Sequence, residues 1–289
     1  MDDRSMAGKI CAITGPTSGI GRATALALGR KGAKLLLLCR SVEKGNALAE
    51  EIKALGGQAE VIETDLSALR SVAESAERLS RKAPQLDVLI NNAGVINMAR
   101  RETVDRLEEM FAVNHLAHFL LTNRLLNALR AAPAGRIVHV GSGAHAFVNG
   151  FDFEDFDWHT RRWATMKAYG HSKLASLLFN RSLSLRLGTS GTVTSNTLHP
   201  GGVASNMGRN NGWIGKLGMG LARPFLISTE KGAETSIYLA SSPEAADYRG
   251  EYFIKCRPAK PKPWAEDDAA AERLWGLSVG LLAERQLSI

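Results

Sequence analysis

The sequence is poor in residues that cross-link, bend or anchor a chain. Its 289 residues include only three cysteines, an odd number without a CxxC pair, so disulfides and a cysteine metal site are not expected. Nine prolines and 45% hydrophobic residues argue against a disordered or collagen-like chain. No apolar run approaches the roughly 18 residues of a membrane span, and the start, MDDRSMAGK, does not resemble a signal peptide. We therefore expect a cytoplasmic globular protein without a transmembrane anchor.

Positive charge is in excess, with 36 Lys and Arg residues against 29 Asp and Glu residues, a net charge of +7. Such an excess suits nucleic acid, an anionic lipid surface or a phosphorylated small molecule. No basic helix or aromatic-rich binding motif accompanies the charge, so nucleic acid is not an expected partner. Four cations in residues 255–262 precede a helical stripe at Ala270, Leu274, Leu277 or Ser278, and Leu281. The stripe is expected to pack on its own domain, with weak membrane-surface contact as the alternative.

Short apolar runs alternate with helix-length amphipathic segments along the chain. We predict strands at residues 9–14, 34–39, 59–64, 88–90, 136–140, 192–198 and 252–255. Helices are predicted near residues 20–31, 42–55, 67–82, 102–129, 166–187 and 230–240. Strands that are apolar throughout and alternate with helices indicate a parallel sheet covered on both faces. The sequence thus predicts an α/β fold with a single domain over residues 1–289, a Rossmann-type doubly wound parallel sheet of about seven strands.

A glycine-rich turn joins the first predicted strand to the first helix. Glycines allow the backbone to turn tightly and to approach a pyrophosphate, which then lies at the positive N-terminus of the helix. Such turns also occur without nucleotides, but this position in a first strand–helix–strand unit favours a dinucleotide. The residues expected to bind it are Gly15, Thr17, Ser18, Gly19, Ile20 and Gly21.

The end of the second strand distinguishes between the two nicotinamide dinucleotides. An acidic residue there would bind the ribose 2′-hydroxyl and repel a 2′-phosphate. The chain instead has Arg40 and Ser41, followed by Lys44. Arg40 offers a fork of donors that suits a phosphate, and Ser41 opens a helix whose N-terminus favours anions. NADP(H) is therefore the predicted cofactor, and an ordinary solvated arginine is the alternative interpretation of Arg40.

Two further turns end strands at the same edge of the predicted sheet. Asp65 and Leu66 follow the third strand, and Asn92, Ala93 and Gly94 follow the fourth. Ligands of doubly wound sheets lie at the carboxyl ends of the strands, so both turns are expected to face the cofactor. The small residues allow an adenosine ribose to approach closely, and a tight turn that needs glycine is the alternative.

Tyr169 and Lys173 are four residues apart on a predicted helix and therefore share one face. A cation held close to a phenol lowers the phenol pKa from about 10 toward neutral pH, which suits proton exchange with an alcohol or carbonyl oxygen. The pair alone is only suggestive, because a YxxxK spacing also arises by chance. Ser142 ends the fifth strand at the same edge, and Asn114 interrupts an apolar helical pattern where an asparagine is unfavourable.

In this order, the motifs TGxxxGIG, DL, NNAG, Asn114, Ser142, YxxxK and Pro200-Gly201 resemble those of the short-chain dehydrogenase/reductase superfamily. The stretches LLCRSVEKG, AYGHSKLASLLF and LHPGGVASNMGR are most similar to its retinol dehydrogenase-like group, which includes the oxidoreductase domain of WW-domain oxidoreductase. The resemblance implies a catalytic tetrad of Asn114, Ser142, Tyr169 and Lys173. It also implies cofactor contacts from Tyr169, Lys173, Pro200, Gly202, Val203 and Ser205. Gly141 departs from the family, which usually has a serine before the catalytic one.

The resemblance implies an NADP(H)-dependent oxidoreductase that interconverts an alcohol and an aldehyde or ketone. In this hypothesis Tyr169 exchanges the proton, Ser142 holds the substrate oxygen, Lys173 stabilises the tyrosinate, and Asn114 positions a water that relays protons. A catalytically silent NADP-binding sensor or interaction protein is one alternative, and a steroid or other lipid dehydrogenase is another.

The insert between Ser142 and Tyr169 is rich in aromatic residues. It contains Phe147, Phe151, Phe153, Phe156, Trp158 and Trp163. These side chains are interpreted either as the wall of a pocket for a lipophilic, retinal-like substrate or as a small core that pins the insert. Residues 204–227 are expected to form a substrate lid, and residues 256–289 a C-terminal extension. No further ligand accompanies His115 and His118, so no metal is expected, and the sequence is compatible with a homo-oligomer.

Overall fold

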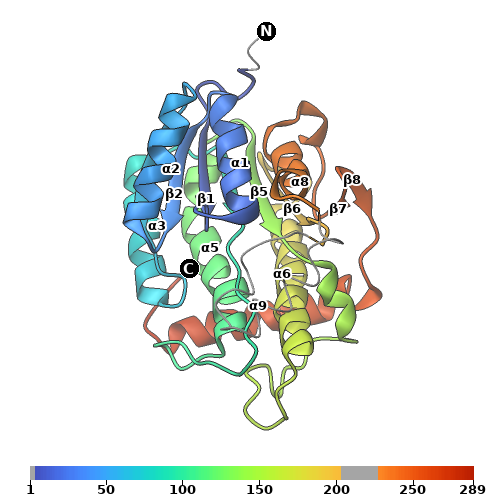
Figure 1. Ribbon diagram of the computed structural model, residues 1–289. Coiled ribbons are helices and arrows are strands. Elements are labelled where there is room, and N and C mark those ends of the chain that lie inside the picture. Colours follow the sequence, from blue (N-terminus) through green and yellow to red (C-terminus); the bar gives the residue numbers. More distant parts are fainter. Residues whose placement is uncertain (1–3, 203–226) are drawn as a thin grey trace.

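The computed structural model describes residues 4–202 and 227–289 and is built around one twisted sheet (Figure 1). Its strands are β1 (Ile10–Thr14), β2 (Lys34–Cys39), β3 (Gln58–Glu63), β4 (Val88–Asn91), β5 (Gly135–Val140), β6 (Val193–His199), β7 (Tyr252–Ile254) and β8 (Arg257–Ala259). They lie in the order β3-β2-β1-β4-β5-β6-β7-β8. All neighbouring pairs are parallel except β7 and β8. The order reverses between β1 and β4, so a crevice for a ligand is expected at the carboxyl ends of these strands.

Helices cover both faces of the sheet (Figure 1). They are α1 (Gly19–Arg30), α2 (Val42–Ala54), α3 (Leu69–Lys82), α4 (Glu109–Phe111), α5 (Ala117–Arg130), α6 (Thr165–Leu187), α8 (Thr229–Ser241) and α9 (Asp268–Ala283). The short helices are η1 (Ala112–Leu116, a π-helix) and the 3-10 turns η2 (Gly143–Phe147), η5 (Pro243–Ala245) and η6 (Pro263–Ala265). Helix α1 contacts both α2 and α8 on one face, and α3, α5, α6 and α9 lie on the other.

The apolar run of β2 shows how the sheet separates two cores. Leu36 and Leu38 belong to the core beneath α3, α5 and α6, whereas Leu35 and Leu37 belong to the core beneath α1 and α8. Alternate side chains of a strand point to opposite faces, so a strand covered on both sides must be apolar at every position. All four leucines are buried, as the parallel arrangement predicted from the sequence requires.

The sheet has eight strands rather than the expected seven or so, because the chain folds back after β7. Lys255 and Cys256 both have positive φ values, 51° and 59°, as the two-residue turn of a tight hairpin requires. Neither residue type favours that conformation, and Pro258 lies in β8 itself. Proline is tolerated there because β8 is an edge strand. The conformational preferences of these residues therefore do not predict the hairpin.

The helix expected over residues 102–129 begins later, at Glu109. Arg106 has a φ of 58°, a left-handed conformation that a continuous helix does not contain. Glu108 precedes the helix, and its carboxylate accepts hydrogen bonds of 2.8 Å from the backbone N–H groups of Met110 and Phe111. This capping carboxylate fixes the start of the helix, and residues 102–108 form a turn instead.

The C-terminal stripe packs on the molecule itself, as expected. Leu274, Ser278 and Leu281 of α9 are buried, and the Ser278 hydroxyl lies 2.9 Å from His115 Nε2 of η1. Trp275 meets Phe119 of α5 edge-on at 4.8 Å between ring centroids. Within the described residues, none of the helices combines the length and the hydropathy needed to cross a bilayer.

Candidate active site

Tyr169, Lys173, Ser142 and Asn114 come together where β4 and β5 end. Tyr169 and Lys173 lie on α6, and the Lys173 Nζ is 5.8 Å from the centroid of the Tyr169 ring. The ammonium donates a 2.9 Å hydrogen bond to the carbonyl of Val140, the last residue of β5. Ser142 follows two residues later and hydrogen-bonds to Tyr169. The structure therefore gathers the four side chains that the sequence singled out.

Burial controls the ionisation of this group. It raises the pKa of Tyr169 to about 12, although the hydrogen bond with Ser142 acts in the opposite direction. It also lowers the pKa of Lys173 to about 8, because a buried ammonium loses its hydration. The expectation that Lys173 lowers the Tyr169 pKa toward neutrality is therefore wrong for the protein alone. The phenol remains protonated at neutral pH, in the form that can donate a proton.

Asn114 lies in the π-helix η1, which explains an asparagine inside an apolar helical pattern. Its amide accepts a 2.8 Å hydrogen bond from the N–H of Val95 and donates a 3.0 Å bond to the carbonyl of the same residue. A third bond, of 2.9 Å, goes to the hydroxyl of Ser172 on α6. Asn114 thus ties α6 to the loop after β4. Single π-turns of this kind are frequent at functional sites.

Two histidines that sequence reasoning missed hold the turn that follows Ser142. His145 Nδ1 lies 2.8 Å from the Ser142 carbonyl, and His199 Nδ1 accepts a 3.0 Å bond from the N–H of Gly143. The Ser142 hydroxyl itself accepts a 3.1 Å bond from the N–H of Ala144. Burial lowers the pKa of both histidines, which favours their neutral forms. Their only sequence signal is proximity to Ser142 and Pro200.

His145 also connects this turn to the C-terminal segment. A carbonyl can only accept, so the contact with Ser142 places the proton on Nδ1 and leaves Nε2 as an acceptor. Nε2 accepts a 3.2 Å bond from the N–H of Lys262, and the His145 carbonyl accepts a 2.9 Å bond from the Trp264 indole. The ring is buried and lies edge-on to Tyr252 at 5.4 Å. Three regions of the sequence therefore meet at this one imidazole.

The glycine turn after β1 has the compactness that a dinucleotide site requires. Gly15 has a φ of 63° and Gly19 a φ of 56°. A Cβ at Gly21 would lie 2.4 Å from the Asn92 amide nitrogen and from the Gly15 carbonyl oxygen, so only glycine fits. The exposed Ser18 side chain makes no capping hydrogen bond, and the first turn of α1 contains no acidic residue. This turn can therefore receive an anionic group at the N-terminus of α1.

Thr14 and Asn92 hold that turn against the end of β4. The Thr14 hydroxyl accepts 3.0 Å bonds from the N–H groups of Asn92 and Ala93, and it lies 3.0 Å from His118 Nε2. The Asn92 amide donates to the carbonyls of Thr14 and Gly15, at 2.8 and 3.2 Å. Asn92 thus holds the glycine turn in place, a structural role that was not predicted beside its expected contact with the cofactor.

Gly94 lies beside two members of the tetrad. A Cβ there would lie 3.3 Å from Asn114 Oδ1 and 3.5 Å from Lys173 Nζ. A side chain at this position would therefore crowd the Asn114 amide beside the buried ammonium. Of the other predicted positions, Thr17 and Ile20 belong to the glycine turn and to the first turn of α1.

Arg40, Ser41, Asp65 and Leu66 follow the ends of β2 and β3, as expected. Arg40 is exposed, and Ser41 caps α2 by accepting a 3.3 Å bond from the N–H of Lys44. Asp65 Oδ1 accepts bonds from the N–H and hydroxyl of Ser67, at 2.9 and 2.7 Å. Leu66 is partly buried against the core beneath α3.

The turn after β6 contains the other predicted cofactor contacts. Gly201 has a φ of 89°, and the carbonyl of Gly202 accepts a 2.8 Å bond from the N–H of Ile227. Pro200 precedes them directly after β6. Val203, Ser205 and all but the last residue of the expected lid at 204–227 lie outside the described residues.

His115 and His118 both contact groups of the protein itself. His118 Nδ1 lies 3.3 Å from the carbonyl of Asn114, and His115 hydrogen-bonds to α9. Burial lowers the pKa of His115 to about 3 and of His118 to about 4, so both remain neutral. Across residues 4–202 and 227–289, no three His, Cys, Asp or Glu side chains are grouped as a metal site.

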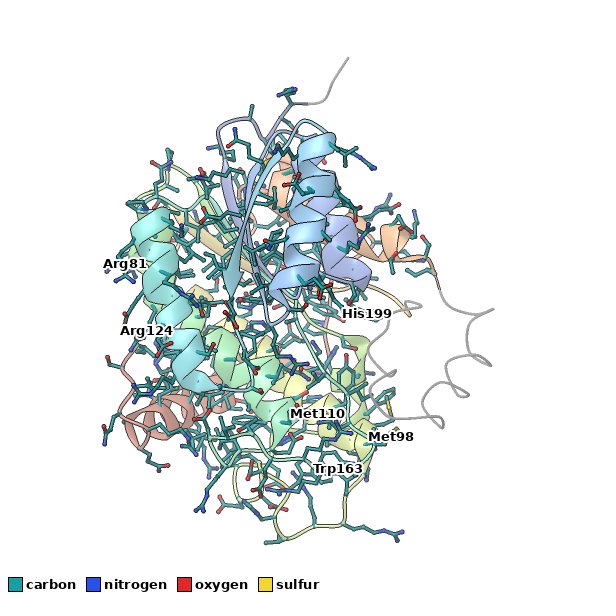
Figure 2. The ribbon with its side chains drawn as sticks, turned by 60° about the vertical axis from the view of Figure 1, so that its left-hand side comes forward. Arg81, Met98, Met110, Arg124, Trp163 and His199 are labelled. Carbon is teal, nitrogen blue, oxygen red and sulfur yellow. The ribbon has the colours of Figure 1, made fainter. Side chains whose placement is uncertain are left out.

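Most aromatic residues of the insert pack into the molecule. Phe156 lies 5.0 Å from Phe111 of α4, and Phe151 stacks on His171 of α6 at 4.1 Å. Trp158 and Trp163 instead belong to a cluster with Tyr169. Figure 2 shows Met98, Met110 and Trp163 on the same side of the molecule as His199. The insert therefore serves mainly as a small core, and its tryptophans approach the candidate site.

Known proteins resemble this chain over most of its length. A family model of short chain dehydrogenases matches residues 9–154. Human retinol dehydrogenase 13 is 42% identical over 282 residues, which cover 95% of this chain and 85% of the relative. WW domain-containing oxidoreductase of Gallus gallus is 36% identical, covering 99% of this chain and 70% of that protein.

Solved structures share the fold as well. A protein from Mycobacterium paratuberculosis has a TM-score of 0.78 at 33% identity, covering 95% of this chain and 93% of its own. RhlG of Pseudomonas aeruginosa, in an active-site complex with NADP, has a TM-score of 0.69 at 26% identity and covers 88% and 96%.

Proposed function

Because the chain belongs to the short-chain dehydrogenase family, we propose that it is an NADP(H)-dependent oxidoreductase that interconverts an alcohol and an aldehyde or ketone. The observation that carries the proposal is the convergence of Ser142, Tyr169 and Lys173 beside the glycine turn. When bound, the nicotinamide cofactor supplies or accepts the hydride, and the protein supplies orientation and proton transfer.

The glycine turn and the turns after β2, β3 and β4 would hold the cofactor. The backbone at Gly15, Gly19 and Gly21 allows the pyrophosphate to approach the N-terminus of α1. Arg40 would bind a 2′-phosphate, which distinguishes NADP from NAD. The exposed position of Arg40 directly after β2 supports this assignment.

Tyr169 would exchange the proton with the substrate oxygen. Its raised pKa keeps the phenol protonated, so the residue suits donation to a carbonyl during reduction. Ser142 would hold the same oxygen by hydrogen bonding, since its hydroxyl lies beside the phenol. Lys173, with a pKa of about 8, would stabilise the tyrosinate formed when the proton leaves. Asn114 would act through α6 and the loop after β4, which it connects.

The substrate that we propose is lipophilic. Trp158, Trp163 and Met110 cluster with Tyr169, which gives the site an apolar surrounding. Burial of apolar area contributes about 25 cal/mol per Å², so a long or fused-ring substrate gains binding energy that a small ketone lacks. The names of the related retinol dehydrogenases agree with a substrate of this class.

The test measures NADPH oxidation against a series of aldehydes of increasing chain length, followed by the same series with Tyr169→Phe. We expect kcat/KM to rise with chain length and kcat of the variant to fall at least a hundredfold, because proton transfer contributes about 10²–10⁴-fold. Tyr248→Phe is the matched control, since Tyr248 packs on Phe253 away from the tetrad. NADPH affinity of both variants shows whether they still bind cofactor.

Near-normal turnover of Tyr169→Phe would overturn the assignment of the acid. A preference for short polar aldehydes would overturn the lipophilic substrate and leave the oxidoreductase standing. NADPH binding without turnover of any aldehyde, ketone or quinone would instead favour the alternative that the protein is a catalytically silent NADP-binding sensor.

A further inference from the structure

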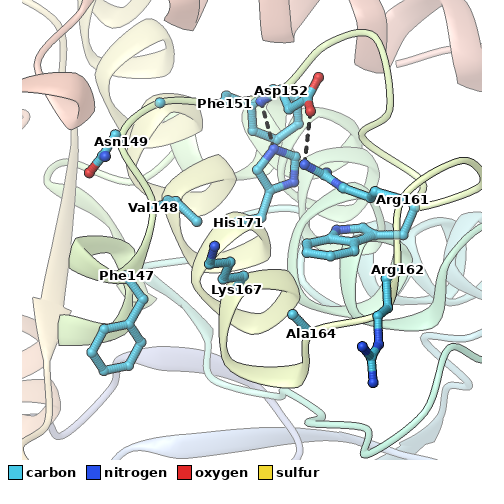
Figure 3. Close-up of a pocket in the computed structure, with 12 residues that line it drawn as sticks. Phe147, Val148, Asn149, Phe151, Asp152, Arg161, Arg162, Ala164, Lys167 and His171 are labelled. Carbon is cyan, nitrogen blue, oxygen red and sulfur yellow. Dashed lines mark hydrogen bonds and ion pairs between the residues drawn. The ribbon is translucent and has the colours of Figure 1, made fainter.

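A cavity of about 530 Å³ lies between α6 and the insert that precedes it (Figure 3). From α6 it is lined by Lys167 and His171, which are four residues apart on one face. Tyr169 and Lys173 are displaced from them by two residues, which is about 200° around a helix of 3.6 residues per turn. The two pairs of side chains therefore point to opposite sides of α6, and Trp158 borders both the cavity and the cluster that contains Tyr169. The binding proposed here does not rest on the catalytic function proposed above.

Part of the cavity wall is aromatic, and two of its aromatic side chains are buried. Phe151 and Trp158 are buried, with only 9% and 5% of their surface exposed. The Phe151 ring stacks on the His171 imidazole at 4.1 Å with an interplanar angle of 11°. Phe147 and Val148 complete the apolar side. Such a surface suits a hydrocarbon body.

Three cations line the same cavity, and only one of them is neutralised. Arg161 stacks on Trp158 at 3.8 Å and forms an ion pair of 2.8 Å with Asp152. Arg162 and Lys167 are both exposed, and the described part of the chain offers neither of them a hydrogen-bond or ion-pair partner. In Figure 3 they lie on either side of Ala164, with Phe147 beyond Lys167. The cavity therefore combines two uncompensated positive charges with an apolar floor.

We propose that this cavity binds a small amphiphile with an anionic head group and an apolar body. Arg162 and Lys167 would bind the head group, a carboxylate or a phosphate, through charge-assisted hydrogen bonds. The aromatic wall formed by Phe147, Phe151 and Trp158 would receive the hydrocarbon. The volume lies within the range of about 300–1,000 Å³ that small-molecule sites occupy.

Calorimetric titration of the full chain tests the proposal with octanoate, octyl phosphate and octanol as probes. The two anions are expected to bind at least tenfold more tightly than octanol, and their ranking identifies the preferred head group. The double variant Arg162→Gln/Lys167→Gln should weaken anion binding at least tenfold. Each single variant should give a smaller loss, which keeps the test valid if the double variant is unstable.

The matched control is Arg30→Gln/Lys53→Gln, which removes the same charge from exposed positions on α1 and α2. It should bind octanoate as the unmodified protein does, and so should Tyr169→Phe. Equal affinity for octanol and the anions would overturn the proposal. So would unchanged anion binding by the Arg162→Gln/Lys167→Gln protein, which would place the anion elsewhere, including the substrate site.

Discussion

At the residue scale, Arg40 is the position with the clearest consequence for cofactor choice. It is exposed directly after the last residue of β2, where an acidic side chain would select NAD. Each charge-assisted hydrogen bond to a 2′-phosphate contributes about 1.5–3 kcal/mol, which corresponds to about a tenfold to hundredfold change in affinity.

The Arg40→Asp protein should therefore lose its preference for NADPH over NADH or reverse it, as fluorescence titration with both dinucleotides would show. Arg30→Asp, at the exposed end of α1, makes the same charge change away from the glycine turn and should leave the preference intact. Equal affinity of the unmodified protein for the two dinucleotides would refute the assignment.

At the element scale, the turn η2 depends on contacts that its own residues do not provide. His145 donates to the carbonyl of Ser142 and accepts from the N–H of Lys262, so it couples the Ser142 turn to the C-terminal segment. An asparagine places a donor near the Nδ1 position, and a glutamine places an acceptor near the Nε2 position. The two substitutions therefore remove different halves of the same connection.

We expect His145→Gln to lower kcat about fivefold to tenfold, since a lost hydrogen bond costs about 1 kcal/mol and the Ser142 turn loses its support. His145→Asn should retain more of the activity, and KM for NADPH should change little in both. The exposed His159 provides the control variant His159→Gln. Steady-state kinetics in which both His145 variants lose activity equally would contradict a positioning role for the bond to Ser142.

The π-helix is the second element whose form depends on its surroundings. Asn114 satisfies both backbone groups of Val95 and also reaches Ser172 on α6. Local helix propensity alone would favour a regular α-helix at Asn114. The wider π-turn forms here because Asn114 makes three hydrogen bonds to other segments, which stabilise it. The same arrangement leaves Gly94 facing Lys173 without a side chain between them.

At the scale of the whole molecule, the buried ammonium of Lys173 makes folding depend on pH. Its pKa is about 8 in the folded protein against 10.5 for an ordinary lysine. Between these pH values the unfolded chain binds more protons, so the free energy of unfolding rises with pH by up to about 1.4 kcal/mol per unit. Well below pH 8 both states are protonated and the contribution stays constant.

Urea unfolding at pH 7, 8, 9 and 10 would reveal this dependence. The stability of the unmodified protein relative to Lys173→Met should rise only slightly from pH 7 to 8 and more steeply above pH 8, because methionine has no proton to lose. For Lys53→Met, at an exposed site on α2, the free energy of unfolding should vary with pH as it does for the unmodified protein. Parallel curves for Lys173→Met would show that the ammonium is not buried in solution.

The sequence by itself determined the order of strands and helices and the edge of the sheet at which the site lies. A strand that is covered on both faces must be apolar throughout, as β2 is. Such runs therefore predict buried strands from the sequence alone. The glycine turn, Arg40 and the Tyr169–Lys173 spacing are local patterns as well, and the structure places them where the sequence predicted.

Tertiary structure decided what depends on burial and on distant partners. The raised pKa of Tyr169, the π-helix at Asn114 and the support of Ser142 by His145 and His199 all arise from segments far apart in the chain. The hairpin of β8 forms because β7 offers an edge, against the local preferences of its turn. Desolvation and cross-segment hydrogen bonds have no local signature, so periodicity and spacing predict neither.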